Sequence, residues 1–179
     1  PNILKVLTPL FPDHLRAQLQ EAGDNPRKLF NLRNRLAKIR VFDPACGSGN
    51  FLVIAYRELR QLELKVLRTL HDSGQQMLDI TSIIQVDVDQ FHGIEIEEFP
   101  VQIAQVALWL TDHQMNAQVS EEFGQYFVRL PLAKSAHIVH GNALRLDWNA
   151  VIPAAQCSFV MGNPPFIGKT YLNDAQRAD

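Results

Sequence analysis

A strand-like segment that runs through a glycine-rich turn into a helix constrains this fold more than any other feature. The segment is VFDPACGSGNFL, Val41–Leu52. Its apolar start favours a strand, which Asp43-Pro44 ends. Gly47 and Gly49 can adopt positive φ and bring bare backbone close to a ligand, and the N-terminus of the next helix points at the same place. The segment predicts the first strand–turn–helix unit of a parallel α/β sheet, with a ligand site at the carboxyl edge.

Strand-like and helix-like segments alternate along the rest of the chain. Apolar residues recur at helical spacing over 51–70 and 98–115. The apolar residues that share one face of the second of these helices are Ile103, Val106, Ala107 and Leu110. The short apolar runs that predict strands are 39–42, 91–96, 137–141 and 158–161. This alternation predicts an α/β sandwich with a mostly parallel sheet.

Two segments fall outside this alternation. Residues 1–38 are expected to form a helical lead-in segment, which Pro9, Pro12 and Pro26 break up. Residues 39–179 then form the main domain. Gly74 is expected to end the first long helix, and the stretch from about 73 to 90 is an insertion whose structure the sequence leaves open.

The formal net charge of the chain, −2, argues against strong nucleic-acid binding by these 179 residues alone. It does not exclude DNA as a partner, because a basic surface can lie elsewhere in a longer protein. The stretch Arg27–Arg40 holds six basic residues and no acidic one, which fits a solvated helix face or contact with a phosphate backbone. The chain has no apolar run of membrane-spanning length and no opening signal segment. Because Cys46 and Cys157 form no pair pattern, a reducing cytoplasm is expected.

The glycine turn departs from two familiar nucleotide-binding patterns. Leu52 occupies the third glycine position of G-x-G-x-x-G, and no Gly-Lys-Ser/Thr follows, which disfavours a nicotinamide-dependent dehydrogenase and a P-loop. Asp43 is better suited to a cationic amine or sulfonium. At the end of the second strand, Glu95 could accept both hydroxyls of a ribose or serve only the structure. Asn142, after the third strand, could meet an adenine edge or simply form a turn.

A second motif, GNPPF, follows the fourth strand at residues 162–166. Pro164 and Pro165 stiffen this loop and remove backbone donors, so that the remaining groups are acceptors, among them the side-chain oxygen of Asn163. Phe166 offers a face on which a base can stack. Acceptors beside a stacking ring suit a planar base with an exocyclic amine. The amine could then attack a positioned methyl sulfonium in line, without a covalent intermediate.

Together, DPACGSGNF and NPPF resemble the motifs of the S-adenosylmethionine-dependent DNA adenine-N6 methyltransferases, in the motif order of their gamma group. Three longer blocks, FLVIAYRELRQLE, GIEIEEFPVQIAQVALWLTDHQMN and HGNALRLDW, resemble the methyltransferase part of type IIL restriction–modification enzymes. The resemblance covers roughly residues 41–169. It implies a Rossmann-like class I methyltransferase sandwich and methyl transfer from S-adenosyl-L-methionine to the N6 amino group of adenine.

The resemblance also implies roles for individual residues. Asp43 would face the amino group of the cofactor, Glu95 would hold its ribose, and Ile96 would pack on its adenine. The implied cofactor-binding residues are Asp43, Pro44, Ala45, Cys46, Gly47, Ser48, Gly49, Asn50, Phe51, Glu95, Ile96, Asn142 and Ala143. The implied catalytic residues, which would bind an adenine flipped out of double-stranded DNA, are Asn163, Pro164, Pro165 and Phe166. Asn142 stands where many relatives have Asp.

The chain is expected to be a truncated, N-terminal part of such a domain. The implied partners are DNA, the remaining C-terminal strands, a target-recognition domain and an attached nuclease. A half-sheet would expose an edge, so weak or no catalysis is expected of these residues alone. The histidines and cysteines form no metal-ligand spacing, so no metal is expected. Two alternatives stay open: a methyltransferase for cytosine N4 or a protein glutamine, and a cofactor-binding module without catalysis.

Overall fold

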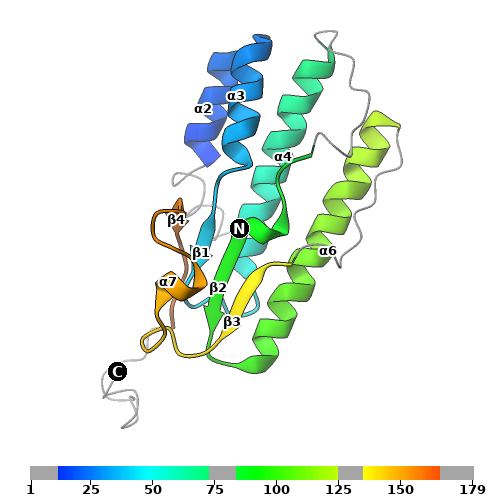
Figure 1. Cartoon of the computed structure of the whole chain (residues 1–179). Coiled ribbons are helices and arrows are strands. Elements are labelled where there is room, and N and C mark those ends of the chain that lie inside the picture. The colour runs from blue at the N-terminus through cyan, green and yellow to red at the C-terminus, as the bar shows by residue number, and fades with distance from the viewer. Residues whose placement is uncertain (1–11, 73–83, 125–134, 166–179) are drawn as a thin grey trace.

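The computed structural model describes residues 12–72, 84–124 and 135–165 of the chain (Figure 1). The elements in chain order are α2 (Pro12–Ala22), α3 (Pro26–Leu36), β1 (Val41–Asp43), α4 (Asn50–Asp72), the 3-10 helix η1 (Val88–Gln90), β2 (Phe91–Glu95), α6 (Glu98–Phe123), β3 (His137–His140), α7 (Trp148–Val151) and β4 (Phe159–Val160). The expected helix end at Gly74 and most of the expected insertion lie outside the described residues.

The described strands form one parallel sheet in the order β3-β2-β1-β4. In its central pairs, Phe42 is opposite His92 on one side and Val160 on the other. All four predicted strands are present, with ends that differ from the prediction by at most two residues. The prediction of an α/β fold with a mostly parallel sheet is therefore confirmed.

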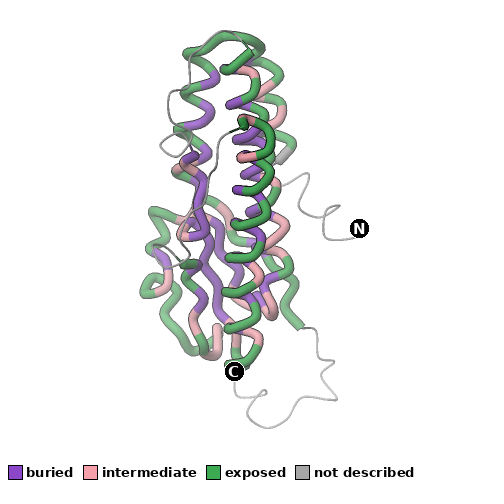
Figure 2. Tube along the Cα trace, turned by 90° about the vertical axis from the view of Figure 1, so that its right-hand side faces the viewer, coloured by how far each residue is buried: buried purple, intermediate pink, exposed green. Residues whose placement is uncertain are grey.

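Helices α4 and α6 cover one face of the sheet, and α2 and α3 pack beside α4 (Figure 1). Buried residues run without a break from these helices to the sheet (Figure 2). Pro12 and Pro26 are the first residues of α2 and α3, a position where the missing N–H costs no helical hydrogen bond. Leu15 and Leu29 belong to the main core, so the predicted lead-in segment packs with the predicted main domain.

The predicted apolar face of α6 is not the face that packs on the protein. Ile103, Val106 and Leu110 are exposed, and Ala107 is partly exposed. The residues on the buried face are Val101, Ala104, Leu108, Thr111, Asp112, Met115, Asn116 and Val119. The four residues do share one face, as predicted, but apolar residues occupy both faces of this helix, and polar residues on the second face are buried through pairing with α4.

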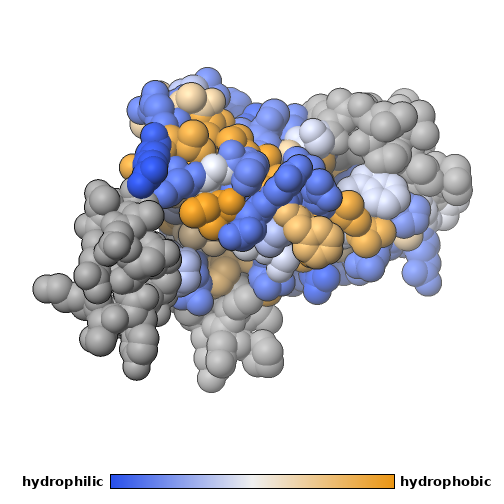
Figure 3. Space-filling model, turned by 90° about the horizontal axis from the view of Figure 1, so that it is seen from below, coloured by the Kyte–Doolittle hydropathy of each residue, from blue (hydrophilic) through white to orange (hydrophobic). Residues whose placement is uncertain are grey.

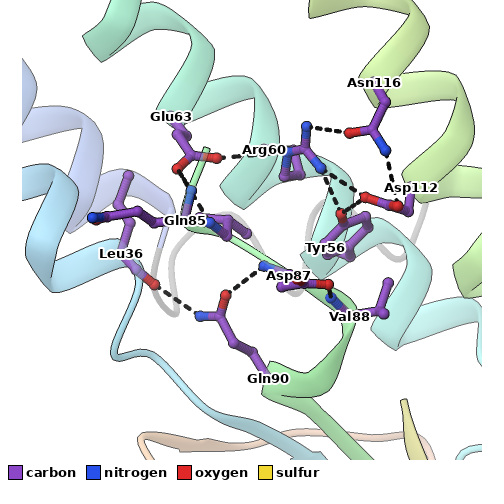
Figure 4. Close-up of polar contacts among 11 residues, drawn as sticks. Leu36, Tyr56, Arg60, Glu63, Gln85, Asp87, Val88, Gln90, Asp112 and Asn116 are labelled. Carbon is purple, nitrogen blue, oxygen red and sulfur yellow. Dashed lines mark hydrogen bonds and ion pairs between the residues drawn. The ribbon is translucent and has the colours of Figure 1, made fainter. Parts of the chain in front are cut away.

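That pairing is a buried polar network centred on Arg60 of α4 (Figure 4). The Arg60 guanidinium donates to the Tyr56 hydroxyl at 2.7 Å, to Asp112 Oδ1 at 2.8 Å and to Asn116 Oδ1 at 2.8 Å. Asn116 donates back to Asp112 at 2.9 Å, and Tyr56 also donates to Asp112. On the other side, Glu63 lies 3.6 Å from the Arg60 Nε. The network fixes α4 against α6.

Burial alone would lower the pKa of Arg60, but Tyr56, Glu63 and Asp112 outweigh it and raise this pKa above its ordinary value. The guanidinium therefore stays charged. Glu63 also accepts from the backbone N–H groups of Gln85 and Val86, at 2.6 and 3.1 Å, and so holds the segment that leads into η1 and β2 (Figure 4).

The basic stretch at residues 27–40 is partly used by the fold. Arg33 is buried, and burial lowers its pKa. Lys28 pairs with Glu21 at 3.1 Å, and Arg40 donates to the carbonyls of Ala37 and Ile39. None of the helices within the described ranges is long and apolar enough to cross a membrane.

Candidate functional site

The two sequence motifs meet at the carboxyl end of β1. The chain leaves β1 towards β2 and β3 and later returns to the other side of β1 as β4. This is the topological switch point at which ligands bind in open α/β sheets. The contact is tight, because a Cβ built on Gly162 would lie 2.4 Å from Asp43 Oδ1. The predicted cofactor turn and the predicted base-binding loop therefore lie side by side.

The glycine turn is locked between β2 and α6. The Cys46 N–H donates to the Ile94 carbonyl at 3.0 Å, and the Gly49 N–H to the Cys46 carbonyl at 2.9 Å. Gly47 has φ of 54° and Gly49 has φ of 81°, in the left-handed region that favours glycine. A Cβ on Gly49 would also lie 3.0 Å from the Ala104 Cβ on α6. The turn is therefore built for close backbone approach, as the sequence predicts.

We expect Gly49→Ala to lower the free energy of unfolding by about 2–4 kcal/mol, since it combines an unfavourable φ with overpacking against Ala104. The matched control is Gly124→Ala, at φ of 63° with no atom of the described residues within 4 Å of the added Cβ. It should cost only about 1 kcal/mol, from the backbone alone. Urea denaturation of both variants checks this, and equal losses would show that the Ala104 contact is unimportant.

Glu95 ends β2 beside this turn. Its Oε2 accepts the Gly47 N–H at 2.8 Å and its Oε1 accepts the Glu97 N–H at 3.0 Å. The Glu95 carbonyl accepts the Gly141 N–H at 2.8 Å, which ties the loop after β3 to the same edge. The carboxylate is thus held at the rim of the site, partly exposed, with lone pairs left for further donors.

Asp43 lies beneath the turn, with 1% of its surface exposed. Its Oδ1 accepts the Ala45 N–H at 3.0 Å. Burial raises the pKa of Asp43 to about 6, the Ala45 hydrogen bond opposes this rise, and the charge of Glu95 adds to it. Direct contact between this carboxylate and a cofactor amine would require the turn and Gly162 to be arranged differently from here.

The other predicted cofactor residues surround the turn. Ile96 is 58% exposed and offers an apolar surface next to Glu95. The Asn142 Oδ1 accepts the Leu144 N–H at 2.9 Å, so this oxygen serves the turn after β3. The Ala143 carbonyl accepts the Trp148 indole N–H at 2.7 Å. The residues with partly exposed surfaces are Pro44, Ala45, Ser48 and Phe51, and Asn50 is exposed.

Cys46 differs from its neighbours in the turn because its thiol is packed inside. A Cβ on Gly93 would lie 2.9 Å from the Cys46 Sγ, so the two residues fit closely. Burial, followed by the charges of Asp43 and Glu95, raises the pKa of Cys46 to about 12. This cysteine therefore supports the turn and is not a nucleophile.

Three of the four predicted catalytic residues, Asn163, Pro164 and Pro165, are exposed at the end of β4. Phe166 lies outside the described residues. Figure 3 shows the molecule from the end at which the strands finish, and apolar and polar surfaces alternate over this face. Among the described residues, no atom lies within 4 Å of a Cβ built on Gly47, so this part of the structure leaves the space over the turn open. Open backbone, a fixed carboxylate and exposed Ile96 fit a ligand that contains a nucleoside.

Helix α7, which was not predicted from the sequence, covers the opposite face of the sheet. Asp147 caps this helix by accepting the Asn149 N–H at 2.9 Å, and an aspartate before a short polar-apolar run is the signal that could have revealed it. The Trp148 ring packs edge-on against Phe42 at 5.3 Å. A pocket of about 300 Å³ opens between α7 and β4, lined in part by Phe42, Trp148 and Val160.

A histidine pair occupies the face of the sheet that carries α7. The His92 and His137 rings stack at 4.8 Å. Burial, followed by the charges of His137 and Arg40, lowers the pKa of His92 to about 4. Within the described part of the chain, no three histidine, cysteine or acidic side chains are arranged to hold a metal ion.

The pKa values of Asp43 and His92 are both shifted from their ordinary values. Between pH 4 and 6, the free energy of unfolding should therefore depend on pH with opposite signs through the two groups. Folded Asp43 keeps a proton that the unfolded carboxyl, with its ordinary pKa of 3.8, has lost, so its contribution falls as pH rises. The unfolded His92, with its ordinary pKa of 6.5, binds a proton that the folded ring resists, so its contribution rises with pH. Each contribution is on the order of 3 kcal/mol.

We therefore expect His92→Gln and Asp43→Asn to tilt the stability profile in opposite directions. Compared with that of the wild type, the free energy of unfolding of His92→Gln should fall more steeply as pH rises from 4 to 6, because no histidine then offsets the Asp43 contribution. Asp43→Asn should gain stability over the same range. Urea denaturation at several pH values measures both slopes, and slopes of the same sign would contradict the prediction.

Comparison with known proteins agrees with this geometry. A chain of MmeI, whose structure is described as a type IIL restriction–modification enzyme in complex with DNA, matches at 58% identity and a TM-score of 0.95, over 99% of this chain and 24% of that one. DNA methyltransferase A of Bacillus subtilis is 42% identical in an alignment of 183 residues, which covers all of this chain and 20% of that protein. The adenine-specific methyltransferase PglX of Streptomyces coelicolor is 31% identical over 71 residues, 40% of this chain and 5% of that protein.

These relatives are much longer than the chain, which spans about a fifth to a quarter of the first two. The profile of one domain family, described as MmeI, DNA-methyltransferase domain, matches residues 19–179. The match begins within α2 and takes in the glycine turn, Glu95 and the loop after β4. The chain belongs to the MmeI DNA-methyltransferase domain family.

Proposed function

We propose that the chain forms the cofactor-binding and base-binding part of a DNA methyltransferase that transfers a methyl group from S-adenosylmethionine to the N6 amino group of adenine, within a restriction–modification enzyme. One observation carries this proposal: the glycine turn after β1 and the Asn163-Pro164-Pro165 loop after β4 lie side by side at the switch point. A methyl donor over the first and a base against the second would have adjacent reacting atoms.

On the cofactor side, the residues of the turn bind and orient. The open backbone at Gly47 would lie along the methionine part of the cofactor, Glu95 would accept the ribose hydroxyls, and Ile96 would pack on the adenine. The cofactor itself would supply an electrophilic methyl group on a sulfonium. Asp43, beneath the turn, would add negative potential under that positive charge.

On the base side, the loop after β4 positions the attacking nitrogen. The side-chain oxygen of Asn163 and the carbonyl of Pro164 would accept the two hydrogens of the exocyclic amine. Accepting them from that direction biases the nitrogen towards a tetrahedral form and exposes its lone pair. The rigid prolines keep these acceptors in position, and Phe166 would stack on the ring. The adenine must leave the duplex to reach this loop.

The experiment that tests the proposal is product analysis with the whole polypeptide. The protein is incubated with double-stranded DNA and isotopically labelled S-adenosylmethionine, the DNA is digested to nucleosides, and these are separated by mass spectrometry. We expect label in N6-methyladenine. Label in N4-methylcytosine, or in a glutamine of a protein substrate, would favour the alternative acceptors. Cofactor binding without any transfer would favour a non-catalytic module.

The described residues alone are proposed to be a weak catalyst, in a cytoplasmic setting. Within the described part of the sheet, β4 pairs with β1 and has no second neighbour. Val160 on this strand is exposed beside the pocket next to α7. Further strands and a target-recognition part would cover this edge and read the DNA sequence.

A further inference from the structure

Helix α6 has a second apolar face, which the fold described above does not use. One face packs on α4 and the sheet. On the opposite side, Phe99 is 70% exposed and Val106 is 54% exposed, and Ile103 and Leu110 are exposed with them. We call Phe99, Ile103, Val106 and Leu110 the outward seam. Figure 2 views the molecule from the side on which α6 lies, and much of this helix is exposed there.

The spacing of the outward seam is that of a helix–helix contact. Its residues follow one another at intervals of four, three and four positions. Alternating three- and four-residue intervals keep apolar side chains in line along a helix, so that a neighbouring helix can pack against them at a shallow angle. Isolated exposed apolar residues are common on protein surfaces, but a continuous row over three turns marks an interaction site.

Beyond Glu97 and Glu98 at its start, α6 itself carries almost no charge along the seam. From Phe99 to Ser120 the ionisable residues are Asp112, which is buried in the Arg60 network, and His113. The other exposed polar residues include Gln102, Gln105, Gln114 and Gln118. A solvated helix face usually carries charged side chains, and a DNA-binding face needs cations to neutralise phosphates. This surface is therefore suited to another protein surface.

We propose that the outward seam docks a helix from another domain of the same, longer polypeptide. The relatives are long enough to contain such a domain, because this chain corresponds to 24% of the MmeI chain and 20% of DNA methyltransferase A. A tethered domain is present at high effective concentration, which favours it over a second copy of the chain. The partner helix would carry apolar residues at the same alternating intervals, with few charges beside them.

The position of the seam gives the docked domain a route to the candidate site. Phe99 lies at the start of α6, three residues after Ile96 and four after Glu95. A helix packed along the seam would therefore reach the rim of the proposed cofactor pocket. Its docking does not depend on which base is methylated, so a test of docking is independent of the proposed function.

The test is thiol labelling of the whole polypeptide with a maleimide. Val106→Cys probes the seam, Ala117→Cys probes its continuation one heptad beyond Leu110, and Asn34→Cys is the control on an exposed position of α3. The wild type gives the background from the native cysteines. We expect both seam thiols to react at least about tenfold more slowly than the control in the native protein, and equally fast after denaturation. Equal native rates for all three would overturn the proposal.

The identity of the occupant is tested by photo-crosslinking. p-Benzoylphenylalanine is incorporated in place of Gln102, which flanks the seam, and cross-linked peptides are mapped by mass spectrometry. We expect cross-links to a segment of the same polypeptide outside residues 1–179. A covalent dimer, protection that is lost on dilution, or a partner peptide within residues 1–179 would each overturn the assignment to another domain.

Discussion

Replacing Arg60 with alanine is expected to lower the free energy of unfolding by about 3–5 kcal/mol. Arg60 is 1% exposed and is the cation to which the buried Asp112 is bonded (Figure 4). The variant would leave the carboxylates of Asp112 and Glu63 buried with one compensating charge fewer. It would also leave the Asn116 amide oxygen without the guanidinium that now donates to it. Urea denaturation followed by circular dichroism measures the loss.

The control for this prediction is an exposed ion pair between the same two helices. Arg68 of α4 pairs with Glu122 of α6, and it is exposed to solvent. Arg68→Ala should therefore cost no more than about 1 kcal/mol, because water solvates both groups. If the Arg60 variant lost no more than the Arg68 variant, the network would not be what holds α4 to α6.

A double variant keeps the prediction testable if Arg60→Ala fails to fold. Arg60→Met with Asp112→Leu removes the buried Arg60–Asp112 pair and fills its space with apolar atoms, while Glu63 keeps its hydrogen bonds from the backbone of Gln85 and Val86. Replacing both partners of a buried pair is often nearly neutral, whereas removing one is costly. We expect the double variant to be more stable than Arg60→Ala. Greater instability would mean that the network contributes net stability as well as specificity.

The network also connects packing to the candidate site. The glycine turn ends at the start of α4, and Glu95 stands just before α6. The Gly47 N–H bonds to Glu95, and Gly49 packs against Ala104 of α6. The relative position of the two helices therefore sets the relative position of the turn and the carboxylate. A loss of the Arg60 contacts should weaken cofactor binding as well as stability.

The sequence predicted the strands and the glycine turn after β1 well, for a local reason. Gly47 and Gly49 have the positive φ values that the turn requires, and the carboxyl ends of parallel strands meet at one edge. Glu95 was found at that edge because it directly follows an apolar strand. Information of this kind is carried within a few residues, where turn chemistry and strand propensity decide the structure.

The features that the sequence did not predict depend on contacts between distant segments. The buried face of α6 was missed because Asp112 looks like a surface residue until Arg60, 52 positions earlier, is placed against it. The burial of Asp43 could not be predicted either, because Gly162, which closes over it, comes from the far end of the chain. Local apolar spacing cannot show which of two apolar faces a partner already covers.

Asn163→Ala in the whole polypeptide is expected to reduce the rate of DNA methylation by about 10²–10³-fold, with S-adenosylmethionine affinity changed little. The proposed role of Asn163 is to accept a hydrogen from the target amine as positive charge develops on it, an interaction that strengthens in the transition state. Its exposed position at the end of β4 makes a large loss of stability unexpected. Single-turnover methylation and calorimetric cofactor titration separate the two effects.

The matched control is Gln20→Ala, which removes an exposed amide on α2, outside the basic stretch, and should leave both readouts unchanged. A third variant, Asn163→Asp, keeps an acceptor oxygen while adding charge, so it should retain more activity than the alanine variant. Methylation by Asn163→Ala at the wild-type rate would remove this residue from the mechanism. A loss of cofactor binding that matched the loss of rate would place Asn163 in the methyl-donor pocket, because an effect on the donor appears in the titration and an effect on the acceptor does not.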